Sequence, residues 1–290
     1  MFLVIMENLD GLQGLSGSIG NSLWVYDNPL IRDLDGLSGI SGELLVNLQI
    51  YNNASLQNID GLTGLAGGVG NLYFFNNPQL ANLNGLSGIT SVAGNLTMDT
   101  LPLLQDLAGL SALAGDVGGS LIIARNTALD NVDALSGLTG ILNAIYLQDN
   151  PALRSLAGLS GVIGALGGDL FVTQNPSLET LEGLGGLRGP IGGTLQIFQN
   201  SSLTTLSGLS EDLSSLAGDL FLTSNALLQD CAALGQLLGA PDGPPADGVG
   251  GSINISGNAS GCATEQELLA SADLPGSGLP IWLLVQGLEN

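Results

Sequence analysis

Apolar and polar positions along the chain recur with a period of 24 or 25 residues. Each period contains a short motif, Leu-x-[Ile/Val/Phe/Leu/Met]-x-x-Asn, as in residues 72–77 and 170–175. Within it, the leucine and the residue two positions later predict the inward face of a β-strand, because successive side chains of a strand alternate. Beyond the strand, apolar residues recur at every third position, which fits a chain bending round a flattened core. A repeat of this length predicts a solenoid, within the range of leucine-rich repeats.

An asparagine closes the motif at nine places. Successive asparagines are 24 or 25 residues apart, except for a step of 49 where Leu101 takes the place of one and a last step of 33. We interpret the column as structural, because an inward-turned amide at a corner can hydrogen-bond the backbone of its own coil and of the next. A ligand site would need exposed amides. The column comprises Asn28, Asn53, Asn77, Asn126, Asn150, Asn175, Asn200, Asn225 and Asn258.

These patterns predict a mainly β fold, a right-handed parallel β solenoid of about ten coils of 24–25 residues over residues 1–262. Residues 1–6 lead directly into a repeat, so we expect a truncated N-terminus or a short first strand. Residues 239–251 exceed the period and predict a loop. A capping box at residues 264–267 predicts a short helix. With a closing strand at 281–285, it would form a C-terminal cap over residues 263–290.

Two stretches, residues 70–86 and 168–184, share the signature G-[ND]-L-x-I-x-x-N-P-x-L-x-x-L-x-G-L in slightly varied form. This signature resembles the receptor L domain, the leucine-rich-repeat-like solenoid of insulin- and epidermal-growth-factor-type receptors. It is also similar to the repeats of fungal GPI-anchored cell-wall proteins. The resemblance covers about residues 8–262, and it implies either recognition through the sheet face or a structural role in a wall. The chain contains no kinase or cysteine-rich module, so the resemblance does not make it a receptor.

The charge composition excludes several function classes. The chain has 26 acidic residues, four arginines, and neither lysine nor histidine, for a net charge of −22. Such a charge repels phosphate backbones and anionic membranes, so we expect no nucleic-acid partner. Ser-His-Asp, Cys-His and Ser-Lys arrangements cannot form. No segment reaches the ~20 apolar residues of a membrane span, so we expect no direct membrane insertion. Zinc loses its commonest ligands, calcium-loop spacings are absent, and we expect neither metal nor cofactor.

A polysaccharide-cleaving β-helix enzyme is the catalytic alternative, because carboxylates recur in columns. Catalysis would require two carboxyl groups at a defined separation in a cleft, one of them with a raised pKa. Asparagine alternates with aspartate in these columns, as turn chemistry prefers. We therefore expect solvated turn residues and no enzyme. The columns are Asp35, Asp60, Asp133 and Glu182, and Asp33, Asp106 and Asp230.

Nine of the twelve aromatic residues occupy outward-facing strand positions. Aromatics favour strands and pack across neighbouring strands, which is the plain explanation. However, five of them crowd the first three coils, and a contiguous exposed aromatic patch usually marks an interaction surface. We predict a principal binding face with Asp27 and Asn52 as its polar rim, and a secondary group further along. The principal face comprises Trp24, Tyr26, Tyr51, Tyr73 and Phe75, and the secondary group Tyr146, Phe171, Phe198 and Phe221.

The two cysteines, Cys231 and Cys262, fall on adjacent coils. They could form a disulfide in an oxidising compartment or remain two buried thiols in a reducing one. Of the five glycosylation sequons, three coincide with the asparagine column and should be buried. In a eukaryotic secretory pathway we therefore expect sugar only on Asn95 and Asn254.

These observations favour a non-enzymatic recognition or adhesion module. It would be secreted or displayed at the cell surface, although no signal peptide is visible, and would bind a protein or carbohydrate ligand. The alternative is a structural component of a cell wall or surface layer.

Overall fold

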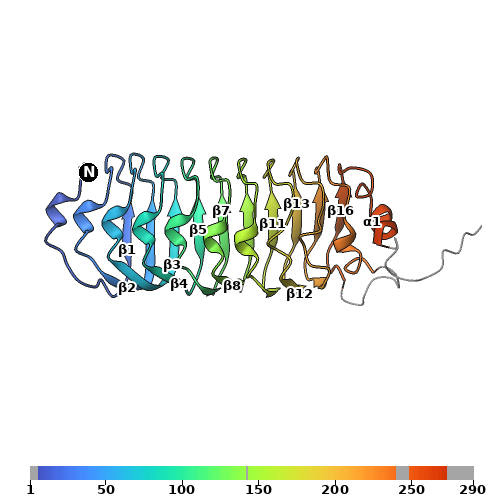
Figure 1. Ribbon diagram of the computed structural model, residues 1–290, viewed down its shortest axis with the longest axis horizontal. Coiled ribbons are helices and arrows are strands. Elements are labelled where there is room, and N and C mark those ends of the chain that lie inside the picture. Colours follow the sequence, from blue (N-terminus) through green and yellow to red (C-terminus); the bar gives the residue numbers. More distant parts are fainter. Residues whose placement is uncertain (1–5, 142, 240–247, 273–290) are drawn as a thin grey trace, which may run out of the picture.

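The computed structural model describes residues 6–141, 143–239 and 248–272. These residues form one elongated parallel β-solenoid with almost no α-helix, which confirms the predicted fold class (Figure 1). Its regular body amounts to about eight turns, slightly fewer than the ten predicted. The path of the main sheet nevertheless runs through ten successive strands.

The main sheet forms one long side of the solenoid. All of its neighbouring strands are parallel, and residues exactly one repeat apart pair with each other, as Leu23 does with Leu48. Leucines at these positions are fully buried from Leu48 to Leu220, as the alternation predicts, and Leu23 in the first strand is half-buried. Its strands are, in order, β1 (Leu23–Tyr26), β2 (Gly42–Tyr51), β3 (Leu65–Phe75), β5 (Leu96–Asp99), β7 (Leu121–Ala124), β9 (Ile145–Gln148), β11 (Leu170–Thr173), β13 (Leu195–Phe198), β15 (Leu220–Thr223) and β16 (Ile253–Ser256).

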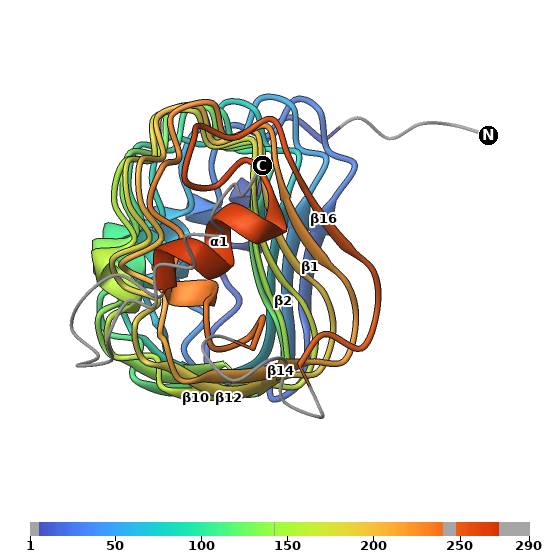
Figure 2. The ribbon, with the colours of Figure 1, turned by 90° about the vertical axis from the view of Figure 1, so that its right-hand side faces the viewer.

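Shorter elements form the other two sides (Figure 2). Short parallel strands lie along the base, and 3-10 helices lie opposite the main sheet, so the cross-section is roughly three-sided. The short strands are β4 (Ile89–Val92), β6 (Gly115–Val117), β8 (Leu138–Ile141), β10 (Gly164–Leu166), β12 (Leu187–Ile191) and β14 (Leu213–Leu216). The 3-10 helices are η1 (Asp10–Leu12), η2 (Asp35–Leu37), η3 (Asp60–Leu62), η4 (Asn84–Leu86), η5 (Ala108–Leu110), η6 (Asp133–Leu135), η7 (Ala157–Leu159) and η8 (Ala232–Leu234).

Glycines within the 3-10 turns allow successive coils to approach closely. A Cβ atom on Gly61 would lie 1.9 Å from the carbonyl oxygen of Leu34 in the preceding coil, and Gly36 meets Leu9 in the same way. No side chain fits in that space. These glycines are therefore required by the stacking of the coils rather than by an unusual backbone angle.

The asparagine column forms a buried ladder. From Asn53 onward, each asparagine bonds back to the preceding coil with both ends of its amide. Its Nδ2 donates to a strand carbonyl at 2.7–3.0 Å. Its Oδ1 accepts from the backbone N–H of the preceding asparagine at 3.0–3.2 Å. Asn28 instead donates to the carbonyl of Tyr26 in its own coil at 2.8 Å. Only the end members, Asn28 and Asn258, are half-buried, and the others are fully buried. The ladder thus pairs backbone groups that the corner would otherwise bury without partners.

Leu101 interrupts this ladder. It is fully buried in the same column, and its own backbone N–H still donates to Oδ1 of Asn126 at 2.9 Å. A leucine side chain cannot return the two bonds to the preceding coil. The N–H of Asn77 and the carbonyl of Phe74 therefore lose their ladder partners at this one interface.

A second polar ladder runs along the corner that precedes the main strands. Nδ2 of Asn71 donates to Oδ1 of Asn47 at 2.8 Å, and Oδ1 of Asn71 accepts from the N–H of Asn95 at 2.8 Å. The same kind of bond links Thr194 to Asp169 at 2.8 Å further along. Both ends of the main strands are thus joined coil to coil by side chains.

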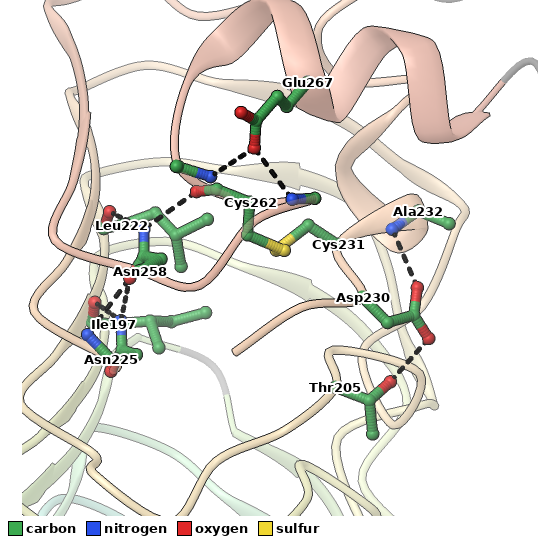
Figure 3. The surroundings of a disulfide bond; sticks show 12 residues. Ile197, Thr205, Leu222, Asn225, Asp230, Cys231, Ala232, Asn258, Cys262 and Glu267 are labelled. Atoms are coloured by element: carbon green, nitrogen blue, oxygen red, sulfur yellow. Dashed lines mark hydrogen bonds between the residues drawn. A yellow bond between two sulfur atoms is a disulfide. The ribbon is translucent and has the colours of Figure 1, made fainter. Parts of the chain in front are cut away.

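The C-terminal end of the solenoid is covered and cross-linked (Figures 2 and 3). Helix α1 (Glu265–Ala272) lies across it. Thr264 Oγ1 accepts from the N–H of Glu267 at 3.2 Å, whereas the carboxylate of Glu267 accepts from Gly261 and Ala263 at 2.7 and 3.1 Å. The Glu267 side chain of the capping box therefore bonds to residues that precede Thr264, the first residue of the box. The predicted closing strand at 281–285 lies outside the described residues.

A disulfide joins Cys231 to Cys262, with an S–S distance of 2.02 Å and Cα atoms 5.8 Å apart. Both cysteines are fully buried. The last ladder residue, Asn258, donates to the carbonyls of Leu222 and Cys262 at 2.7 and 3.0 Å, so the ladder and the disulfide meet at the same place (Figure 3). No helix in the described part of the chain is long and apolar enough to cross a membrane.

Replacing Asn150 by leucine should lower the free energy of unfolding by about 3 kcal/mol, because two buried backbone groups lose their partners. The converse substitution, Leu101→Asn, should raise it by about 1 kcal/mol by restoring the missing pair of bonds. Chemical denaturation of both variants, with the disulfide intact, measures the two effects. If Leu101→Asn destabilised the protein as much as Asn150→Leu does, local packing rather than hydrogen bonding would determine which residue fits this column.

Candidate functional site

The predicted aromatic residues lie on the outer face of the main sheet, in two parallel columns set by the strand register. Trp24, Gln49 and Tyr73 follow one another in the first column. Tyr26, Tyr51 and Phe75 follow one another in the second. All five aromatic residues of the principal face therefore belong to β1, β2 and β3, the first three strands of the sheet.

Four of these rings form a continuous chain. Tyr26 stacks on Tyr51 with ring centroids 5.0 Å apart, Tyr51 meets the edge of Tyr73 at 6.0 Å, and Tyr73 stacks beside Phe75 at 6.1 Å. Such pairs stabilise a sheet beyond the apolar area that they bury. Trp24 stands apart from this chain, because Gln49 lies between it and Tyr73 in the column.

Exposure is greatest at the N-terminal end of this face. Trp24 is 54% exposed and Tyr26 46% exposed. Tyr51, Tyr73 and Phe75 are half-buried between their neighbours. The face thus combines two rings that are about half exposed with three that are more buried.

An amide chain borders the face where the strands end. Nδ2 of Asn52 donates to Oδ1 of Asp27 at 2.9 Å, and Nδ2 of Asn76 donates to Oδ1 of Asn52 at 2.9 Å. Asp27 and Asn52 therefore lie where the polar rim was predicted, with Asn76 as a third member. These residues have positive φ angles of 51–58°.

The face ends at the fourth strand of the sheet. Thr97 and Asp99 of β5, although they point outward, are only 5% and 8% exposed. Arg125 covers this edge, since its guanidinium forms an ion pair with Asp99 and its Nε donates to Thr100 Oγ1 at 3.1 Å. A charged pair thus separates the aromatic face from the rest of the sheet.

Partial burial raises the pKa of two tyrosines in the face. It raises the pKa of Tyr73 above the ordinary 10.0, and the neighbouring carboxylate of Asp99 adds to the effect while Arg125 opposes it. Partial desolvation, followed by Tyr26 and Asp27, likewise raises the pKa of Tyr51. Both hydroxyls are therefore protonated hydrogen-bond donors at neutral pH.

The secondary aromatic residues do not form one patch. Tyr146 and Phe171 meet edge to face at 5.2 Å. Phe198 and Phe221 are half-buried on adjacent strands but lie in different columns of the register. The hydroxyl of Tyr146 donates to Asp169 Oδ2 at 2.8 Å. Burial, this hydrogen bond and the charge of Asp169 raise the pKa of Tyr146 to about 12.

The carboxylate columns shape turns. Asp33, Asp106 and Asp230 each accept a hydrogen bond from the backbone N–H two residues later, at 2.8–3.3 Å. In each case the donor is the first residue of a 3-10 helix. Asp35 and Asp60 are exposed on the 3-10 side. Partial desolvation raises the pKa of the Asp35 carboxyl group, and the nearby carboxylates of Asp33, Asp60 and Asp10 raise it further. Within the described residues, no group of three or more Cys, Asp or Glu side chains could hold a metal ion.

Sequence reasoning missed the backbone conformation that precedes each ladder asparagine. The residue before the column position has a φ of 51–61° in nine successive coils and is not glycine in any of them, and Gly257, before Asn258, continues the series with a φ of 70°. Left-handed geometry costs free energy for ordinary residues and persists only where the surrounding structure imposes it. The signal in the sequence is a column of mostly polar residues: Asp27, Asn52, Asn76, Thr100, Arg125, Asp149, Gln174, Gln199 and Ser224.

No protein-family model matches this chain, and a search of curated proteins finds no match either. The fold and the aromatic face therefore carry the functional argument.

The raised pKa of Tyr146 predicts a pH dependence at high pH. The unfolded chain loses this proton near pH 10 and the folded chain near pH 12. The stabilisation is therefore complete below pH 10 and is lost as the pH rises towards 12. Thermal melts between pH 9 and 12 should show a shallower decline for Tyr146→Phe than for the parent. Equal declines would mean that the hydrogen bond to Asp169 does not control this titration.

Proposed function

We propose that the chain is a non-enzymatic recognition or adhesion module that binds its partner through the aromatic face of β1–β3. The observation that carries the proposal is the chain of rings Tyr26–Tyr51–Tyr73–Phe75, flanked by the exposed Trp24. Packing between strands accounts for the half-buried rings. It does not account for two adjacent aromatic side chains on one strand that are about half exposed, and contiguous exposed aromatics usually mark an interaction surface.

A protein is the partner that this face fits best. The rings lie on an extended sheet with a polar amide rim, and protein interfaces combine an aromatic centre with a polar border in the same way. Tyrosine and tryptophan contribute large contact areas with few rotatable bonds. A glycan stacked on Trp24 or Tyr26 is the alternative occupant.

The buried disulfide supports a secreted or cell-surface location, because such bonds form and persist in oxidising compartments. We further propose that the solenoid is of the receptor L-domain type. The glycine-polar pair before each strand and the asparagine ladder after it are the features that support this assignment. A structural role in a wall or surface layer is the second candidate, and it would leave the aromatic face without a specific ligand.

Replacing Trp24, Tyr26 and Tyr51 together by serine should weaken partner binding at least 100-fold, because the exposed rings would provide the contact area. A screen of the purified chain against protein ectodomains and a glycan array identifies the ligand. Surface plasmon resonance then measures the affinity of each variant. The melting temperature should fall by only a few degrees, since two of the three side chains are about half exposed.

The matched control is the double variant Tyr146→Ser and Phe171→Ser. It also removes an aromatic pair from the same sheet but leaves the first three strands intact. It should bind the ligand as the parent does. Equal losses of binding in both variants, or unaltered binding in the triple variant, would disprove the role of the aromatic face. A chain that binds nothing in the screen would favour the wall component.

When the protein is secreted from a eukaryotic host, Asn95 and Asn254 should be glycosylated and Asn53 and Asn200 should remain unmodified. Asn95 and Asn254 are exposed, and their Oδ1 atoms accept hydrogen bonds without engaging Nδ2. Asn53 and Asn200 are fully buried and use Nδ2 in the ladder. A glycan there would prevent the corner from closing. Glycopeptide mass spectrometry of the folded, secreted protein measures the occupancy, and sugar on Asn53 would contradict this account.

A further inference from the structure

A groove follows the carboxyl ends of β9, β11, β13 and β15, in the half of the solenoid that lies beyond Leu101. Its volume is about 420 Å³. It shares no residue with the aromatic face. Four successive coils line the groove. Each contributes the residue of the positive-φ column, which precedes its ladder asparagine, and the first three also contribute the residue after the asparagine. The lining residues are Asp149, Pro151, Gln174, Pro176, Gln199, Ser201 and Ser224.

The column side chains in this groove are free to bind a ligand. In the first coils, the side chains of the same column hydrogen-bond to one another, since Asn52 donates to Asp27 and Asn76 donates to Asn52. By contrast, among the residues that the structure describes, no hydrogen bond engages the side chains of Asp149, Gln174, Gln199 or Ser224, which are all exposed. The backbone nevertheless holds these four residues at φ angles of 54–61°. The strained corners therefore present an ordered row of unused donors and acceptors.

The residues that line the groove indicate the chemical class of its ligand. Two amides, a carboxylate and hydroxyl groups offer both donors and acceptors, which suits a ligand that carries many hydroxyl groups. Ser201 is partly engaged, because its Oγ donates to the carbonyl of Pro176 at 3.4 Å. No lysine or arginine lines the groove, and the chain carries a net charge of −22, so anionic ligands are disfavoured. The rings of Pro151 and Pro176 provide apolar surface against which the C–H face of a sugar can pack.

The distance between successive coils indicates the shape of the ligand. Equivalent residues recur once per coil, at the spacing of ~4.8 Å between neighbouring strands. This distance is close to the length that one pyranose unit adds to an extended β-1,4-linked chain. Four coils contribute to the groove, so a linear polymer running along the solenoid axis would place about one sugar unit opposite each coil.

We propose that this groove binds a neutral, extended polysaccharide, with about one sugar unit opposite each coil. Gln174 and Gln199 lie at the centre of the row and contact its hydroxyl groups. Asp149 and Ser224 contact the units on either side. This site is separate from the aromatic face, so a protein partner and a glycan chain can be held at once.

The test uses cellohexaose as a neutral β-1,4-linked probe and titrates it into the full chain by isothermal titration calorimetry. The double variant Gln174→Gly and Gln199→Gly should weaken binding at least tenfold. Glycine removes both amides and also tolerates positive φ, so the fold should not suffer. Affinity should rise from cellobiose to cellotetraose and level off beyond it, because four coils line the groove. An oligogalacturonate of equal length, which carries carboxylates, should bind less tightly.

The control Asn52→Gly and Asn76→Gly makes the same change in the same column of the first coils, and it should bind cellohexaose as the parent does. The triple aromatic variant should also bind it normally, which separates this site from the proposed face. The proposal is overturned if the parent binds neither cellohexaose nor mannohexaose at millimolar concentration. It is equally overturned if the Gln174→Gly and Gln199→Gly variant keeps the parent's affinity.

Discussion

The structure depends on a hydrogen bond between a buried asparagine amide and the backbone of the preceding coil. A solenoid corner turns the chain away from the regular sheet pattern, and it leaves an N–H and a carbonyl inside the molecule without partners. The asparagine amide supplies both a donor and an acceptor within one rigid plane, so one side chain satisfies both groups. From Asn53 onward each asparagine bonds back by one coil, so the same requirement recurs along the sheet from β1 to β16, with Leu101 as the one exception in the series. The exposed faces are built on this internal frame.

The frame explains how polar surface can differ along an otherwise uniform body. The strained position before each asparagine is imposed by the corner, so its side chain contributes little to the fold itself. In the first coils this position carries aspartate and asparagine, which bond to one another. At Arg125 it carries a cation that pairs with Asp99. In the later coils it carries glutamine and serine whose side chains form no hydrogen bond with the described part of the chain. One backbone geometry thus presents three different surfaces.

Much of the fold could be predicted because the decisive signals are local. The alternation around Leu72 and Phe74 marks an inward strand face, and Asn77 marks its corner. The glycine at 61 could be recognised as special, but the sequence does not tell whether its backbone angle or a close contact requires it. The structure shows the contact with Leu34. The left-handed geometry of Gln174 could not be predicted, since glutamine has no preference for it. Trp24 is separated from the other rings because Gln49 lies beside it in the next strand. Which residues lie side by side depends on the register between coils.

Leu101 has a consequence for cooperativity. A stack of repeats behaves approximately as a one-dimensional chain whose stability is a sum of coil terms and nearest-neighbour terms. The interface between the coils of Asn77 and Leu101 has the weakest nearest-neighbour term in the ladder, because it lacks two bonds that its counterparts have. The solenoid is therefore divided into a short N-terminal block and a long C-terminal block whose far end is closed by the disulfide. The aromatic face lies wholly in the short block. We therefore expect the coils of the short block to open together before the longer block, with its polar groove, unfolds.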